Sequence, residues 1–160
     1  MKSSIAMAAL FMVMAVHAQQ PGLYPLLTRY YGVKDALTKD DVKGASAAAG
    51  QLLAAVNGVD MSAIPAKDHM AFMSVNNKLA YDARHISEST DIAHQREHFA
   101  SLSANMAALA KQAHLSDRPI YQEYCPMKKS SWLSNDSTIR NPYFGSSMLT
   151  CGKVTTTLKP

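Results

Sequence analysis

Hydrophobic residues recur at helical spacing from about Leu23 to about Leu115. Positions three or four residues apart lie on the same face of a helix, so this period predicts amphipathic helices. Turn-forming residues divide the stretch into four segments. The predicted helices cover residues 23–37, 39–57, 66–87 and 92–114. Because the connections between them are short, neighbouring helices should run antiparallel, and the expected core fold is a four-helix bundle.

Polar residues mark where these helices should begin. Thr38 precedes an acidic pair, Asp40 and Asp41, and resembles an N-cap for the second helix. Residues 87–90 offer the next group of capping side chains, ahead of the fourth helix.

The pattern changes after Pro119. Ile120, Tyr121 and Tyr124 favour strands, and residues 153–158 combine valine with three threonines. The segment between these regions is rich in serine, asparagine and glycine. We therefore expect a mainly α protein whose last part, about 119–160, forms a small β-hairpin or irregular cap on the bundle.

The N-terminus has the features of an export signal. Lys2 precedes an uncharged apolar run, and Ala18 ends a short small-residue segment suited to cleavage. The run is shorter than the roughly 20 residues of a membrane-spanning helix. The sequence predicts a signal peptide at 1–18 and a single domain at 19–160, without a membrane span and located in the periplasm or secreted.

Charge and motifs narrow the range of functions. The 16 basic and 12 acidic residues give a net charge of +4, and the basic residues are scattered, which argues against a nucleic-acid partner. The sequence contains no Cys-x-x-Cys, Gly-rich phosphate loop, nucleophile elbow or zinc-protease motif. We expect a non-enzymatic protein.

The candidate functional groups are sulfur-containing side chains that could bind a metal ion. The two cysteines of the chain, Cys125 and Cys151, each have a methionine close by, Met127 and Met148. Thiolate and thioether ligands favour soft ions such as Cu(I). The alternative is a Cys125–Cys151 disulfide, since an exported protein enters an oxidising compartment.

Other side chains are weaker candidates. His98 follows His94 at a spacing that can bring two imidazoles onto one helical face, so His98 is a further candidate metal ligand, with a hydrogen-bonding core histidine as the alternative. Trp132 and Tyr143 are aromatic rings able to cover a soft cation. Together with Phe144 they are also candidates for contact with a partner protein.

Several short sequence motifs resemble those of a bacterial family of exported domains of unknown function, common in Bacteroidetes-type bacteria. The most specific is Tyr-x-x-Tyr-Cys-Pro-Met, with Asn-Pro-Tyr-Phe-Gly and Met-Leu-x-Cys-Gly following it. The less specific motifs are Tyr-Tyr-x-x-Lys-Asp-Ala-Leu, Gln-Arg-Glu-His-Phe and Trp-Leu-Ser. Together the motifs occur at residues 30–37, 95–103, 121–127, 132–134 and 139–152.

Members of that family occur alone and fused to periplasmic adaptor subunits of heavy-metal efflux pumps. The resemblance therefore implies a helical bundle associated with resistance to copper or other heavy metals. We expect a protein that binds Cu(I), or else Ag(I), Hg(II) or Zn(II), and passes it to an efflux adaptor or metallochaperone. The alternative is an envelope interaction module without metal, stapled by a disulfide.

Overall fold

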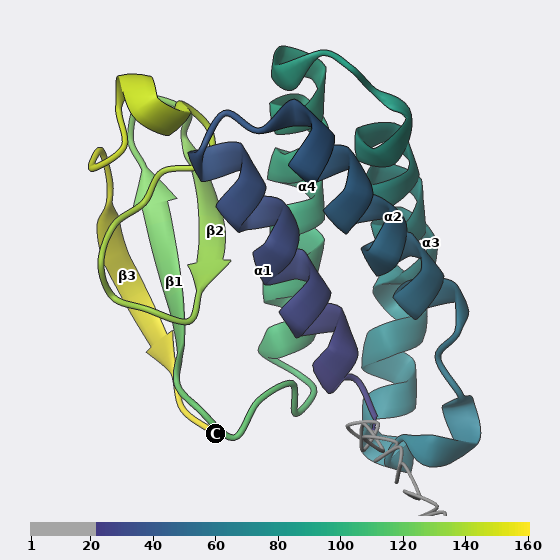
Figure 1. The fold of residues 1–160 in the computed structure, drawn as a ribbon. Helices are drawn as coiled ribbons and strands as arrows, with labels where there is room; N and C mark the ends of the chain where they lie inside the picture. The colour runs from purple at the N-terminus through teal and green to yellow at the C-terminus, as the bar shows by residue number, and fades with distance from the viewer. Residues whose placement is uncertain (1–21) are drawn as a thin grey trace, which may run out of the picture.

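The computed structural model describes residues 22–160, so the predicted signal peptide lies outside the described residues. The protein is mainly helical, with four α-helices followed by a small antiparallel sheet (Figure 1). The helices are α1 (Tyr24–Thr38), α2 (Val42–Asn57), α3 (Ala66–Glu88) and α4 (Ile92–Ala110). Each helix packs against the next one along the chain.

Two helix starts differ from the prediction. Thr38 is the last residue of α1, and its hydroxyl donates to the Asp35 carbonyl at 2.7 Å instead of capping α2. Asp41 is the N-cap of α2 and accepts a hydrogen bond from the Gly44 backbone N–H. The cap of α4 is Asp91, one residue beyond the predicted group. In each case a carboxylate next to the first free amides provides the cap.

The fourth helix is shorter than predicted. It ends at Ala110, and Lys111 forms its C-cap through backbone hydrogen bonds to the Ala107 and Leu109 carbonyls. Ala113 and Leu115 are nevertheless buried. The hydrophobic period therefore continued past the helix because the following loop also covers the core.

The C-terminal part contains a three-stranded sheet, one strand more than a hairpin. The strands are β1 (Ile120–Cys125), β2 (Ser130–Ser134) and β3 (Lys153–Leu158), in the order β2-β1-β3. β1 is central and pairs antiparallel with both neighbours. Strand β2 packs on α4, whereas β3 is an exposed outer strand (Figure 1).

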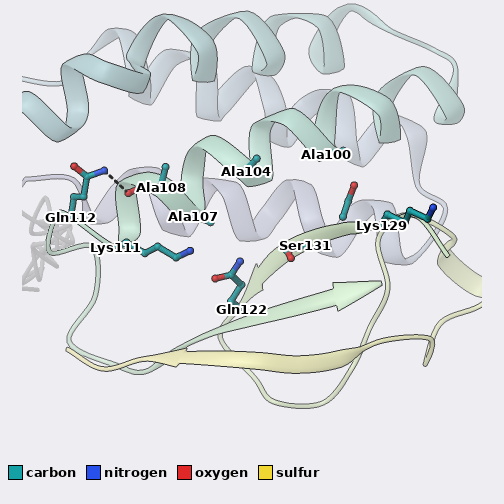
Figure 2. A pocket seen from close by; sticks show the side chains of 10 residues that line it. Ala100, Ala104, Ala107, Ala108, Lys111, Gln112, Gln122, Lys129 and Ser131 are labelled. Atoms are coloured by element: carbon teal, nitrogen blue, oxygen red, sulfur yellow. Dashed lines mark hydrogen bonds between the residues drawn. The ribbon is translucent and has the colours of Figure 1, made fainter. Parts of the chain in front are cut away.

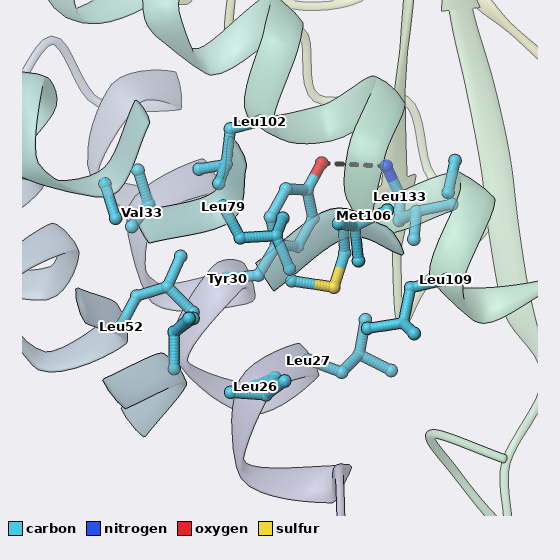
Figure 3. Close-up of a cluster of buried hydrophobic side chains, with 14 of the residues drawn as sticks. Leu26, Leu27, Tyr30, Val33, Leu52, Leu79, Leu102, Met106, Leu109 and Leu133 are labelled. Carbon is cyan, nitrogen blue, oxygen red and sulfur yellow. Dashed lines mark hydrogen bonds between the residues drawn. The ribbon is translucent and has the colours of Figure 1, made fainter. Parts of the chain in front are cut away.

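A single core joins helices and sheet. Tyr30 of α1 is fully buried and stacks on Phe99 of α4, with ring centroids 5.4 Å apart. Its hydroxyl oxygen accepts a hydrogen bond from the backbone N–H of Leu133 in β2 (Figure 3). The sheet is therefore fixed to the helices both by apolar burial and by this buried hydrogen bond.

No helix within residues 22–160 is both long and apolar enough to cross a membrane.

Candidate functional site

The two cysteines lie together in the C-terminal region. Cys125 is the last residue of β1 and is fully buried, whereas Cys151 is half-buried and precedes β3. Both are free thiols. Burial raises the pKa of Cys151, and the neighbouring Cys125 thiol raises it further through charge repulsion and a hydrogen bond. Residues far apart in the sequence thus form one dithiol pair.

Backbone pairing explains why the thiols meet. β1 and β3 are adjacent strands, with Tyr124 opposite Lys153. Cys125 and Cys151 lie just beyond this pair, at the same end of the sheet. Gly152 makes the approach feasible, because its φ of 153° favours glycine and an added Cβ would come within 2.9 Å of the Trp132 ring.

Hydrogen bonds hold both cysteine segments in place. The Lys128 backbone N–H donates to the Cys125 sulfur at 3.4 Å. Asn141, which is fully buried, donates from its side-chain amide to the Cys151 carbonyl at 2.7 Å. The dithiol pair is therefore built on a fixed backbone, which reduces the ordering needed when a ligand binds.

The methionines are placed differently from each other. β1 ends at Cys125 and residues 126–129 form a turn, so Met127 does not continue the strand and is 65% exposed. Met148 is half-buried, and its carbonyl accepts a hydrogen bond from the Cys151 backbone N–H at 3.0 Å. A turn thus joins Met148 to Cys151, and another turn separates Cys125 from the continuation of the chain at Met127.

Two of the predicted aromatic contact residues are in the core. Trp132 and Tyr143 are buried and pack edge to face, with ring centroids 5.9 Å apart. The Tyr143 hydroxyl donates to the Ser131 carbonyl at 2.6 Å. Burial raises the pKa of Tyr143, and the neighbouring Cys125 thiol adds to the effect. These two rings are buried next to the dithiol pair. Of the three aromatic residues predicted to contact a partner, only Phe144 is partly exposed.

His98 belongs to a different part of the molecule. It lies on α4, and its Nδ1 is 3.0 Å from an Asp82 carboxylate oxygen on α3. His94 is one turn earlier on α4, and His85 of α3 stacks on His98. His85 escaped the sequence analysis because its relation to the other two depends on the pairing of α3 with α4.

An open groove of about 500 Å³ runs between α4 and strands β1 and β2 (Figure 2). Its helical wall consists largely of alanines, and Lys111 and Lys129 are among its polar lining residues. None of the predicted metal ligands lines it. The groove is thus separate from both the dithiol pair and the histidines.

Comparison with known proteins identifies the family. No curated protein and no solved structure matches the chain. Residues 26–118, more than half of the chain, match a family described as "Protein of unknown function (DUF3347)". That segment runs from α1 through α4 and stops before the sheet that carries the two cysteines. The chain therefore belongs to the DUF3347 family of proteins of unknown function.

Proposed function

We propose that this protein is a non-enzymatic, exported metal-binding protein that holds a soft ion, foremost Cu(I), for heavy-metal efflux or resistance. The observation that carries the proposal is the meeting of two free thiols, Cys125 and Cys151, at one end of the sheet. Thiolate sulfur selects soft ions over hard ones. In this proposal the helices form an antiparallel four-helix bundle that supports the site.

Each thiol has a distinct part in binding. Cys125 is buried and supplies a fixed ligand, while the partly exposed Cys151 gives the ion a route in. Because the pKa of Cys151 is raised, the ion must displace a proton to obtain a thiolate, so binding strengthens as pH rises.

The methionines complete the proposed site unequally. Met148 is half-buried close to Cys151 in the chain and is the better placed third ligand. The exposed Met127 suits a later step, in which a thioether takes the ion toward an efflux adaptor or metallochaperone. A thioether needs no deprotonation, so Met127 can accept the ion without releasing a proton, while the vacated thiolates take up protons as the ion leaves.

The same thiol contact favours a second candidate function. Oxidation would join Cys125 and Cys151 in a disulfide that staples the sheet, giving an envelope interaction module without metal. Closing a loop of this size would contribute about 3 to 4 kcal/mol by chain entropy. Phe144 is then the aromatic residue available for contact with a partner.

Native mass spectrometry of the mature protein with anaerobic Cu(I), together with a free-thiol count, separates the two candidates. We expect free thiols and one more copper than in Cys125→Ser/Cys151→Ser, whose helical circular dichroism should be unchanged. Ser130→Ala, at a position paired with Cys125 in the sheet, is the matched control and should retain the copper. A mass two hydrogens short without a copper adduct would refute the metal proposal and support the disulfide.

A further inference from the structure

We propose that His85, His94 and His98 form a second metal site, chemically distinct from the dithiol pair, for a borderline divalent ion such as Zn²⁺, Ni²⁺ or Cu²⁺. One potential ligand atom from each of these side chains lies within 4.8 Å of the other two. Within residues 22–160 this is the one such group of three or more His, Cys, Asp or Glu side chains. Neutral imidazole is a ligand suited to these ions.

The helix pairing creates this cluster. His85 lies near the end of α3, and the short connection before α4 returns the chain so that His94 and His98 face it. The His85 and His98 rings are stacked with centroids 4.4 Å apart, and the His94 and His98 centroids are 4.7 Å apart. The two histidines of α4 are separated by one helical turn, which places them on one face.

The three ligand atoms lie within 4.8 Å of one another, which is a wider spacing than around a bound ion. Zinc binds imidazole nitrogen at about 2.0 to 2.1 Å, so two ligands of a tetrahedral ion are separated by about 3.4 Å. All three side chains are partly exposed. Modest side-chain rotations can therefore bring the nitrogens around an ion without repacking the core.

Asp82 is a supporting carboxylate for one of these imidazoles. The hydrogen bond joins Asp82 Oδ1 to His98 Nδ1, and the Asp82 side chain is 4% exposed. When Nδ1–H of a neutral His98 donates to this oxygen, its Nε2 lone pair is left available to a metal. Carboxylates that orient a ligating histidine in this way are a common feature of metal sites.

An ion pair between His98 and Asp82 that serves only to stabilise the fold would explain less of the arrangement of the three histidines than a metal site does. It would account for His98 and Asp82, but not for the other two rings. Within the described residues, neither His85 nor His94 has a side-chain hydrogen bond or an ion pair. Their ring nitrogens are thus available, and three imidazoles leave a fourth position open for water or an exchanging ligand, as in zinc sites that are not closed.

The cluster is also separate from the thiols in the fold. Figure 1 shows α3 on the side of the helices away from the sheet, whereas both cysteines border the sheet. An ion bound to the histidines therefore does not require Cys125 or Cys151. This separation allows the two sites to be tested independently.

The test is a Zn²⁺ titration of Cys125→Ser/Cys151→Ser protein against a chromophoric chelator. We expect one bound ion, with the Kd raised at least 100-fold by His85→Ala or His98→Ala. Asp82→Asn should raise the Kd by about 10- to 100-fold, as for other supporting carboxylates. The matched control is His114→Ala, because His114 is an exposed histidine bonded to Asp117 outside the cluster; it should leave the Kd unchanged.

Nitrogen-15 NMR of the imidazoles gives a second readout. Zn²⁺ should shift the ligating ring nitrogens of His85, His94 and His98 and leave those of His114 unchanged. Absence of Zn²⁺ binding, or equal affinity in His85→Ala/His94→Ala protein, would overturn this site. Such a result would leave the Cu(I) difference between wild type and the double-cysteine variant unaffected, so the two proposals fail independently.

Discussion

Arg96 and Asp40 join two parts of the chain that are remote in sequence. The Arg96 Nη2 donates to the Asp40 carboxylate and, at 3.0 Å, to the Leu37 carbonyl, while its Nε donates to the Pro142 carbonyl at 2.9 Å. Asp40 also accepts a hydrogen bond from the Ser146 backbone N–H at 3.0 Å. One guanidinium thus holds the corner between α1 and α2 against the loop that leads to Cys151.

Replacing Arg96 should destabilise the whole protein. Arg96→Ala would leave the Leu37 and Pro142 carbonyls without this donor, and we expect a loss of about 2 to 3 kcal/mol in the free energy of unfolding. Arg96→Lys should recover only part, because an ammonium lacks the planar donor fork. Urea denaturation measures both. Arg29→Ala removes an exposed arginine bonded to Gln51 and is the control; equal losses for Arg29 and Arg96 would contradict the assigned role.

The same contact predicts a dependence of stability on acid. Hydrogen bonds from Ser146 and then Arg96 lower the pKa of Asp40 from 3.8 to about 2. Because the folded-state pKa is the lower one, the contribution is present above about pH 3.8 and is lost as the pH falls through about 2. Asp40→Asn should flatten this part of the stability profile. Urea midpoints between pH 2 and pH 6 measure it, and parallel profiles for variant and wild type would refute the prediction.

Glu123 should have the opposite dependence on pH. Burial raises the pKa of its carboxyl from 4.5 to about 7, although the Lys34 ammonium opposes the shift. Within the described residues neither carboxyl oxygen forms a hydrogen bond of ordinary length and angle, and the nearby Trp132 indole N–H offsets only part of the effect of burial on the pKa. The raised folded-state pKa means that stability is highest below about pH 4.5 and falls as the pH rises through about 7.

Glu123→Gln removes the buried charge and should therefore flatten this decline. Since one pKa unit corresponds to about 1.4 kcal/mol, we expect the variant to exceed wild type by about 1 to 3 kcal/mol at pH 8. Thermal unfolding from pH 4 to pH 9 measures the difference. Glu97→Gln, at an exposed position of α4, is the control. A variant that loses stability with rising pH as steeply as wild type would exclude Glu123 as the cause.

Tyr30→Phe tests the hydrogen bonds that join the helices to the sheet. The Tyr30 hydroxyl lies 2.7 Å from Ser103 Oγ and 3.0 Å from the Leu133 backbone nitrogen, all buried. Losing the hydroxyl leaves both partners unsatisfied, so we expect a cost of about 2 to 3 kcal/mol in the free energy of unfolding. Tyr24→Phe, which removes an exposed bond to Asp117, should cost less than about 1 kcal/mol. Similar costs for the two variants would argue against the role of Tyr30.

Gly145→Ala should disturb the loop held by Arg96. Gly145 has a φ of 55°, and an added Cβ would clash with the side chains of Asp40 and Arg96. We expect a loss of about 1 to 3 kcal/mol in the free energy of unfolding. Gly50→Ala in α2 is a matched control, because its Cβ would meet only Ser87 at 4.0 Å and should stabilise the helix by up to about 1 kcal/mol. Chemical denaturation distinguishes the variants, and a neutral Gly145→Ala would contradict the packing.

The sequence predicted all four helices but placed some of their ends wrongly. Periodicity reports which residues face a core, and the predicted helices contain Tyr30, Leu52, Leu79 and Leu102, which are all fully buried. It does not report where the backbone turns. Asp40 has a φ of 58°, which breaks the helical conformation between α1 and α2. The N-cap of α2 is therefore Asp41 and not Thr38.

The candidate sites, too, could be predicted only in part from the sequence. The sequence selected Cys125 and Cys151 by residue type, but their contact depends on β1 lying beside β3. It also assigned Trp132 and Tyr143 to a contact surface, since composition alone does not distinguish a buried ring from an exposed one. Their burial became evident only from the way the sheet packs against α4.

The amino-acid sequence by itself determined the local properties of this protein: the helical segments, the strand-forming end and the supply of thiols, thioethers and imidazoles. These follow from backbone propensity and side-chain chemistry, which act over a few residues. Only the tertiary structure decided which of these groups meet, as in the dithiol pair and the grouping of His85 with His94 and His98. Such contacts are set by the packing of whole elements, because burying their apolar faces fixes the relative position of residues far apart in the chain.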